Sequence, residues 1–261
     1  MAIQTVAKGA VSLGAPINAD DIQLLGGSAV INQSNLDWSS VAAAATVIVP
    51  YDFNGSLGSV TTPFVANVSS FFEYNASGGD CYWTSDGSAS DTSARLIQRG
   101  NGHMHLVGSV GLVTSAEVFG GSFTVAASTA FTNGYFGGGA TIRVYDVGTD
   151  PTLIRNEGAT VFLWRGATTI NHDAGATHIM SEVSGNTITT LNIHGAGVHI
   201  DNTGGANITN CNCYGGIPNT ARLAQAFTID NTILNLSLQG ARDFENHPLI
   251  THSSVTYIGG R

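Results

Sequence analysis

The stretch Ile188-Thr-Thr-Leu-Asn-Ile-His-Gly195 recurs in the next part of the chain as Ile208-Thr-Asn-Cys-Asn-Cys-Tyr-Gly215. The same phrase occurs earlier as Val113-Thr-Ser-Ala-Glu-Val-Phe-Gly120, and a looser copy runs Ala130-Phe-Thr-Asn-Gly-Tyr-Phe-Gly137. Self-similarity at a period of about 20 residues is typical of stacked architectures, in which each unit covers the apolar face of its neighbour. The sequence therefore predicts a repeat fold in this part of the chain.

The apolar pattern within each copy indicates a solenoid of β-strands. Apolar residues stand at the first, fourth and sixth positions of the clear copies, and alternation resumes after the glycine in the opposite parity. Alternation is the period of a strand, while the step from first to fourth position requires a corner. We therefore expect coils of a short parallel β-solenoid. The predicted inward-facing residues are Val113, Ala116, Val118, Phe123, Val125, Ile188, Leu191, Ile193, Val198, Ile200, Ile208, Cys211 and Cys213. The predicted coil turns contain Gly120, Gly121, Gly137, Gly138, Gly195 and Gly215.

The composition also favours an all-β protein. Charged residues make up 10% of the 261 residues, against roughly 25% in ordinary globular proteins. The chain has 33 glycines and a single lysine, Lys8. Exposed helices are usually built from Glu, Lys, Arg, Gln and Ala, so this chain can form few of them.

The repeat suggests three regions. Residues 106–223 are predicted to form the solenoid. Residues 1–105 lack clear copies of the phrase and are predicted to form a separate N-terminal β-region for attachment or capping. Residues 224–261 are expected to be a C-terminal β cap or a segment exchanged between subunits. Caps are expected because exposed ladder edges recruit other chains.

Charge and hydropathy argue against two classes of partner. The nine basic residues are scattered and the net charge is −9, so a phosphate-binding surface for nucleic acid is not expected. No apolar run approaches the roughly 20 residues of a membrane helix. The N-terminus lacks a basic segment followed by an apolar core, so we expect no secretory signal peptide.

Potential metal and cofactor motifs are incomplete. Cys211 and Cys213 fall at inward coil positions and are expected to be reduced core thiols, because a Cys-x-Cys pair on one strand cannot readily form a disulfide. His103-Met-His105 has the spacing of some metal ligands, but no carboxylate or third histidine follows nearby in the sequence. The alternative is that these histidines face solvent while Met104 and Leu106 point inward. No metal and no cofactor is predicted.

Catalysis is considered because right-handed β-helices often cleave polysaccharides. Hydrolysis needs two carboxylates about 5–10 Å apart. The candidates are Asp173, Asp201, Asp230, and Asp243 with Glu245. The separation of Asp173 and Asp201 is not a multiple of the repeat period, so the repeat does not stack them. We expect no catalytic residues and a protein that is not an enzyme.

The phrases starting at Ile188 and Val113 resemble the "TxxLxVxGGxxxV" coils of β-solenoid virion proteins from tailed bacteriophages. The resemblance covers about half of the chain, residues 106–223, and concerns architecture. It implies a homotrimeric virion component of the capsid decoration (cement) or head-fibre type. Such a protein is made in the host cytoplasm and assembled onto the capsid surface.

Three functional classes follow from this resemblance. The first is a decoration protein that binds the major capsid protein and stabilises the shell, with residues 1–45 as the grip. The second is a tail or head-fibre adhesin that binds host surface glycans. The third is a polysaccharide lyase or glycoside hydrolase of the β-helix type. The short chain and the absence of a credible acid pair favour the decoration protein.

Overall fold

The computed structural model confirms an all-β fold of parallel coils of about 20 residues, about eight turns in all. It describes residues 3–6, 21–24, 30–31, 44–65, 68–84, 95–108, 113–126, 131–146, 149–180, 186–201 and 207–260. The chain divides into two compact units. Unit 1 comprises Met1–Thr132 with Val147–Thr149, and unit 2 comprises Asn133–Asp146 with Asp150–Arg261.

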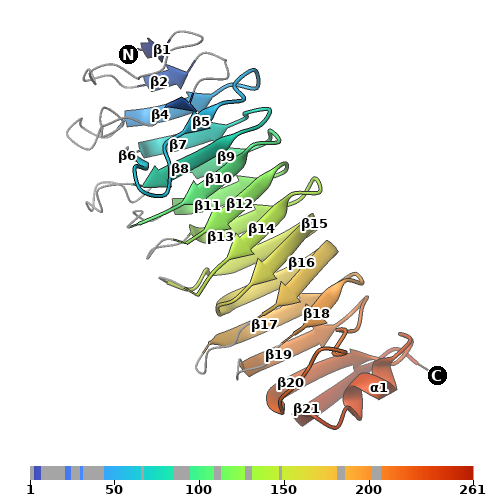
Figure 1. The fold of residues 1–261 in the computed structure, drawn as a ribbon. Coiled ribbons are helices and arrows are strands. Elements are labelled where there is room, and N and C mark those ends of the chain that lie inside the picture. Colours follow the sequence, from blue (N-terminus) through green and yellow to red (C-terminus); the bar gives the residue numbers. More distant parts are fainter. Residues whose placement is uncertain are drawn as a thin grey trace. The chain divides into compact units, whose positions relative to one another are not determined.

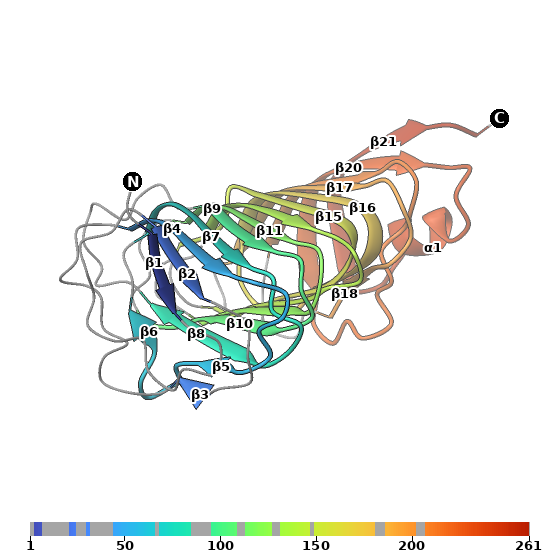
Figure 2. The same ribbon diagram turned by 90° about the horizontal axis from the view of Figure 1, so that it is seen from above.

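Unit 1 contains two parallel ladders that form opposite sides of its coils (Figures 1 and 2). The first ladder runs β1 (Ile3–Val6), β2 (Asp21–Leu24), β4 (Ala44–Val49), β7 (Val68–Tyr74), β9 (Arg95–Gln98) and β11 (Val113–Val118). The second runs β3 (Val30–Ile31), β5 (Ser56–Leu57), β8 (Asp80–Thr84), β10 (His103–Leu106) and β12 (Ser122–Val125), with β6 (Phe64–Val65) also beside β8.

Unit 2 has the same design with longer strands. One ladder runs β13 (Phe131–Phe136), β15 (Leu153–Leu163), β16 (Ala167–Ile179), β17 (Thr187–Ile193), β19 (Asn207–Cys213), β20 (Phe227–Asn235) and β21 (Ile250–Ile258). The other consists of β14 (Thr141–Val144), the second halves of β15 and β16, and β18 (Val198–Ile200). Register shifts within β15 between Asn156 and Thr160 mark where that strand passes from one ladder to the other.

The predicted limits of the solenoid have to be corrected. The sequence predicts a separate β-region before residue 106, but β4, β7 and β9 pair in parallel with one another and with β11, as coil strands do. Likewise, β20 and β21 extend the ladder beyond residue 223. The region predicted to grip the capsid, residues 1–45, lies mostly outside the described residues.

The core lies inside the coils. All thirteen residues that the repeat places inward are buried, each at most 2% exposed. Equivalent side chains stack across coils, so that Ile170, Leu191 and Cys211 follow one another in register. The three cysteines are buried and unpaired, with 3.9 Å between Cys211 Sγ and Cys213 Sγ. The corner expected between the first and fourth positions lies within continuous strands, where two successive side chains point outward.

The six predicted turn glycines lie in the connections that follow β11, β13, β17 and β19. Gly121 needs to be glycine for two reasons: its φ is +63°, and a Cβ there would collide with the carbonyl oxygen of Gly102 in the coil before it. The turns of successive coils are therefore packed backbone against backbone.

The last coil contains a short helix that the repeat does not predict. After β20 the chain turns at Gly240, with φ +83°, forms α1 (Ala241–Glu245) and returns as β21. The ring of buried Phe244 meets the His252 imidazole edge-on, with centroids 5.2 Å apart, and His252 Nε2 lies 3.3 Å from the Phe244 carbonyl oxygen. These contacts hold α1 against β21.

Candidate functional site

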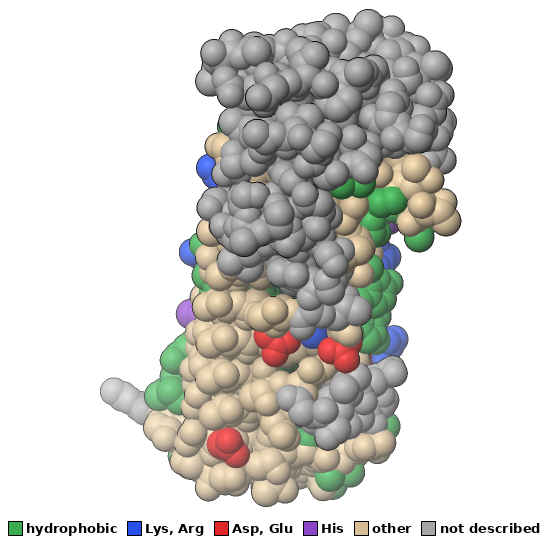
Figure 3. Space-filling model, turned by 90° about the vertical axis from the view of Figure 1, so that its left-hand side faces the viewer, with side chains coloured by type: hydrophobic (Ala, Val, Ile, Leu, Met, Phe, Trp, Pro, Cys, Tyr) green, Lys and Arg blue, Asp and Glu red, His purple; other side chains and the backbone are tan. Residues whose placement is uncertain are grey.

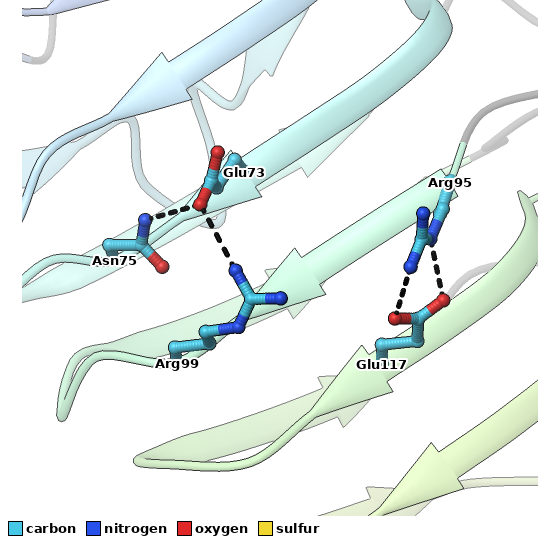
Figure 4. A network of polar contacts seen from close by, with 5 residues as sticks. All are labelled: Glu73, Asn75, Arg95, Arg99 and Glu117. Carbon is cyan, nitrogen blue, oxygen red and sulfur yellow. Dashed lines mark hydrogen bonds and ion pairs between the residues drawn. The ribbon is translucent and has the colours of Figure 1, made fainter.

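A charged network lies on the first ladder of unit 1 (Figure 4). Arg95 binds Glu117 through two contacts of 2.6 Å, and Arg99 Nη1 lies 3.4 Å from Glu73 Oε1. Asn75 donates to the same Glu73 oxygen at 2.7 Å. Because each carboxylate is engaged by its own arginine, these acids serve as ion-pair partners between coils rather than as a free acid–base pair.

The His-x-His motif has a carboxylate that sequence reasoning missed. The β8–β10 register places Asp80 beside His103, and Asp80 Oδ1 lies 3.3 Å from both His103 Nδ1 and His105 Nε2. The His105 ring also stacks on Tyr82 with centroids 4.4 Å apart. Burial, with a smaller contribution from Asp80, raises the pKa of Tyr82. Within the described part of the chain, no group of three His, Cys, Asp or Glu residues is arranged to hold a metal.

Unit 2 carries an outward column of stacked rings on its second ladder. Register places Arg143, Phe162, His178 and His199 in line. The Phe162–His178 and His178–His199 centroids are 4.7 and 4.4 Å apart, with nearly parallel planes, and the Arg143 guanidinium lies 5.8 Å from the Phe162 centroid. Because the ring faces are covered by their neighbours, this column offers few free faces to a ligand. Burial, and then the neighbouring His178, lowers the pKa of His199.

The catalytic candidates are dispersed among different partners. Asp173 binds Arg155 at 3.0 Å, and Asp201 is buried and lies 3.2 Å from His178 Nδ1. Glu245 accepts hydrogen bonds from Tyr257 and Arg242, which in that order hold the pKa of the carboxyl below its usual value. Asp230 is exposed on β20. The structure thus gives these acids separate surroundings.

The C-terminal strands of the first ladder of unit 2 carry few charged side chains. Strands β17 to β21 contain one Asp, Glu, Lys or Arg, which is Asp230. Seven uncharged outward positions on β16, β17, β19 and β20 define what we call the Asn/Thr face, made of Thr169, Asn171, Thr190, Asn192, Asn210, Asn212 and Asn231. Charged side chains border this face, because Arg155 on β15 is in register with Asn171 and the exposed Asp230 precedes Asn231 on β20. Figure 3 shows a side of the molecule whose lower half consists mostly of backbone and of side chains that are neither hydrophobic nor charged, with a few acidic groups among them.

Hydrogen bonds between the asparagine side chains of successive coils order the Asn/Thr face. Asn192 donates to Asn171 and accepts from Asn212, both at 2.8 Å, while Asn231 donates to Asn210 at 3.1 Å. The side chains are therefore held in fixed conformations by neighbours in the stack. A surface ordered in advance loses little side-chain entropy when another surface covers it.

A groove lies at the C-terminal end of unit 2, between residues 217–221 and α1 with its flanking turns, and its lining is more apolar than polar. It has a volume of about 400 Å³. Its polar lining comes from Asn219, Thr220, Gln239, Asp243 and His247. Of the catalytic candidates, Asp243 lines this groove.

No protein-family model matches the chain, and no curated protein or solved structure matches it. The described residues include no helix that is both long enough and apolar enough to cross a membrane. Function therefore has to be inferred from the geometry above.

Proposed function

We propose that the protein is a non-enzymatic structural component of an assembly, a homotrimeric capsid decoration protein that binds the major capsid protein at the outer surface of a virion. The observation that carries the assembly role is the Asn/Thr face, which spans four stacked strands without a charged side chain at its seven positions. Burying these seven positions against a neighbouring copy removes no ionised group from water, and the bordering Arg155 and Asp230 would lie at the rim of the contact, where charged groups keep their hydration.

The capsid location rests on the resemblance of the coils to tailed-phage virion proteins. The rigid, hydrogen-bonded stack supports the same role, because a protein that reinforces a shell acts through buried contact area and stiffness rather than through chemistry. Three copies associated through the Asn/Thr face would each bind a capsomer, and their association would stabilise the shell by linkage.

The first test is the mass of the purified protein in solution, measured by light scattering. We expect a trimer, and Thr190→Lys on the Asn/Thr face should convert it to a monomer with an unchanged far-UV spectrum. Thr160→Lys, on the second ladder of the same unit, is the matched control and should remain trimeric. A monomeric wild-type protein at millimolar concentration would refute the trimer.

The second test locates the protein in intact particles. Quantitative mass spectrometry should find hundreds of copies per particle for a decoration protein. A few trimers per particle would instead favour a tail adhesin, and release of oligosaccharides from capsular polysaccharide would favour an enzyme.

A further inference from the structure

We infer that the groove beside α1 is a binding site for an uncharged oligosaccharide. This inference goes beyond the proposed assembly role and does not depend on it. It rests on the groove's two rigid walls, on the hydrogen-bonding groups that line it, and on the charges that it lacks.

The first wall is anchored to the solenoid. The Asn219 backbone pairs with β18, donating to Val198 O at 2.8 Å and accepting from Ile200 N at 2.9 Å. The side-chain Oδ1 of Asn219 accepts from Ala221 N at 2.9 Å, which orients the amide. The Asn219 Nδ2 group thereby becomes a positioned donor at the edge of the groove.

The second wall is α1 with its C-terminal turn. Asp243 on α1 and His247 in the turn after it both line the groove. Leu249 N donates to His247 Nδ1 at 3.3 Å, and this hydrogen bond leaves the proton of the neutral imidazole on Nε2. The wall therefore provides a carboxylate acceptor and an imidazole donor, with the Gln239 amide beside them.

The lining selects among ligand classes. It contains no lysine or arginine and one carboxylate, so phosphate and other anions are disfavoured. The described residues offer no three-ligand metal set, and Phe244 is 3% exposed, so the groove lacks an open aromatic platform for a flat apolar ligand. Two amides, a hydroxyl, a carboxylate and an imidazole instead match the alternating donors and acceptors of sugar hydroxyls. The volume of about 400 Å³ suits one or two sugar rings.

The test is saturation-transfer NMR and calorimetry on the full chain with a panel of neutral di- and trisaccharides, including maltotriose, cellobiose and N,N′-diacetylchitobiose. We expect at least one of them to bind. Asp243→Ala should weaken that binding at least tenfold, because it removes a charged acceptor of hydroxyl hydrogen bonds. Asp230→Ala changes another exposed acid, on β20 outside the groove, and should alter affinity less than twofold.

Three results would overturn the inference. They are no saturation transfer from the panel at millimolar concentration, equal losses in Asp243→Ala and Asp230→Ala, and tighter binding of glucuronate-containing saccharides than of neutral ones. The oligomeric state is measured separately with Thr190→Lys. Failure of the groove and failure of the proposed trimer are therefore distinguishable.

Discussion

Buried polar side chains near the turns of unit 2 form hydrogen bonds with the backbone of those turns. Asn156 is fully buried, and its amide donates to Ala159 O, Ala176 O and Thr177 Oγ1 at 2.9–3.1 Å while accepting from Ala159 N at 2.8 Å. In the next coil His172 contacts Thr177 Oγ1 at 3.0 Å and Ala196 O at 2.8 Å. These side chains satisfy backbone groups that the turns would otherwise bury without partners.

The ring column makes unit 2 sensitive to acid. The pKa of His199 lies below its usual value of 6.5, because the folded chain buries the imidazole and places it against His178, with Asp201, Arg222 and His172 as the other charged or titratable neighbours. A histidine with a lowered pKa binds its proton more tightly in the unfolded chain. The contribution of His199 to the free energy of unfolding is therefore largest above about pH 6.5 and decreases as the pH falls from there through the lower pKa of the folded state.

We expect the urea midpoint of the wild-type protein to decrease between pH 7.5 and pH 5. His199→Phe keeps a ring in the stack but removes the titrating group, so its midpoint should decrease less over the same range. At pH 7.5 the two proteins should have similar far-UV spectra. An identical pH dependence in both would show that His199 does not contribute.

At the scale of elements, the turns limit how closely coils can stack. Gly121 and Gly139 both have left-handed φ values, +63° and +74°, but only Gly121 has a neighbouring backbone where a Cβ would be. Gly139→Ala should cost about 1 kcal/mol, from the left-handed conformation alone. Gly121→Ala should cost at least about 2 kcal/mol more, because the coil must also move away from Gly102.

The comparison is made by urea denaturation of both variants, with the slope of the transition as the check on compactness. Equal losses would mean that the backbone contact at Gly121 relaxes without cost.

At the scale of the whole molecule, each coil contacts only its neighbours, so damage should remain local. Leu191 is fully buried between Ile170 and Cys211 in register. Leu191→Ala should lower the free energy of unfolding by about 3 kcal/mol through the lost transfer energy and the cavity.

Hydrogen exchange of the Leu191→Ala variant shows which strands lose stability. Protection should decrease in β16, β17 and β19, whereas β4, β7 and β9 in unit 1 should keep theirs. A uniform decrease along the chain would instead indicate that the protein unfolds as one cooperative block.

The sequence predicts the coils where inward positions are apolar and spacing is regular. Asn156 and His172 occupy the same inward column as Ile193, but their polarity hides the coils between residues 140 and 185. Irregular spacing conceals other coils, because Ile154 pairs with the nearby Ile170 whereas Phe71 pairs with the more distant Arg95. A search for one fixed period therefore does not detect the N-terminal coils.

The candidate sites were less predictable than the fold. Asp80 reaches His103 and His105 through the register of two strands that belong to successive coils, and no local motif signals that contact. The groove lies between residues 217–221 and α1, and the repeat contains no helix that would predict it. Such sites depend on how irregular connections pack, which hydrophobic periodicity does not report.

The parallel register has a consequence for how the protein is made. Each coil strand pairs with a strand of the coil before it, as β17 does with the first half of β16 and β19 does with β17. A strand that emerges from the ribosome therefore meets a partner that has already been synthesised. Such contacts are short in sequence for a β-protein, and domains generally fold from the N-terminus during translation. The solenoid can thus grow coil by coil as the nascent chain lengthens.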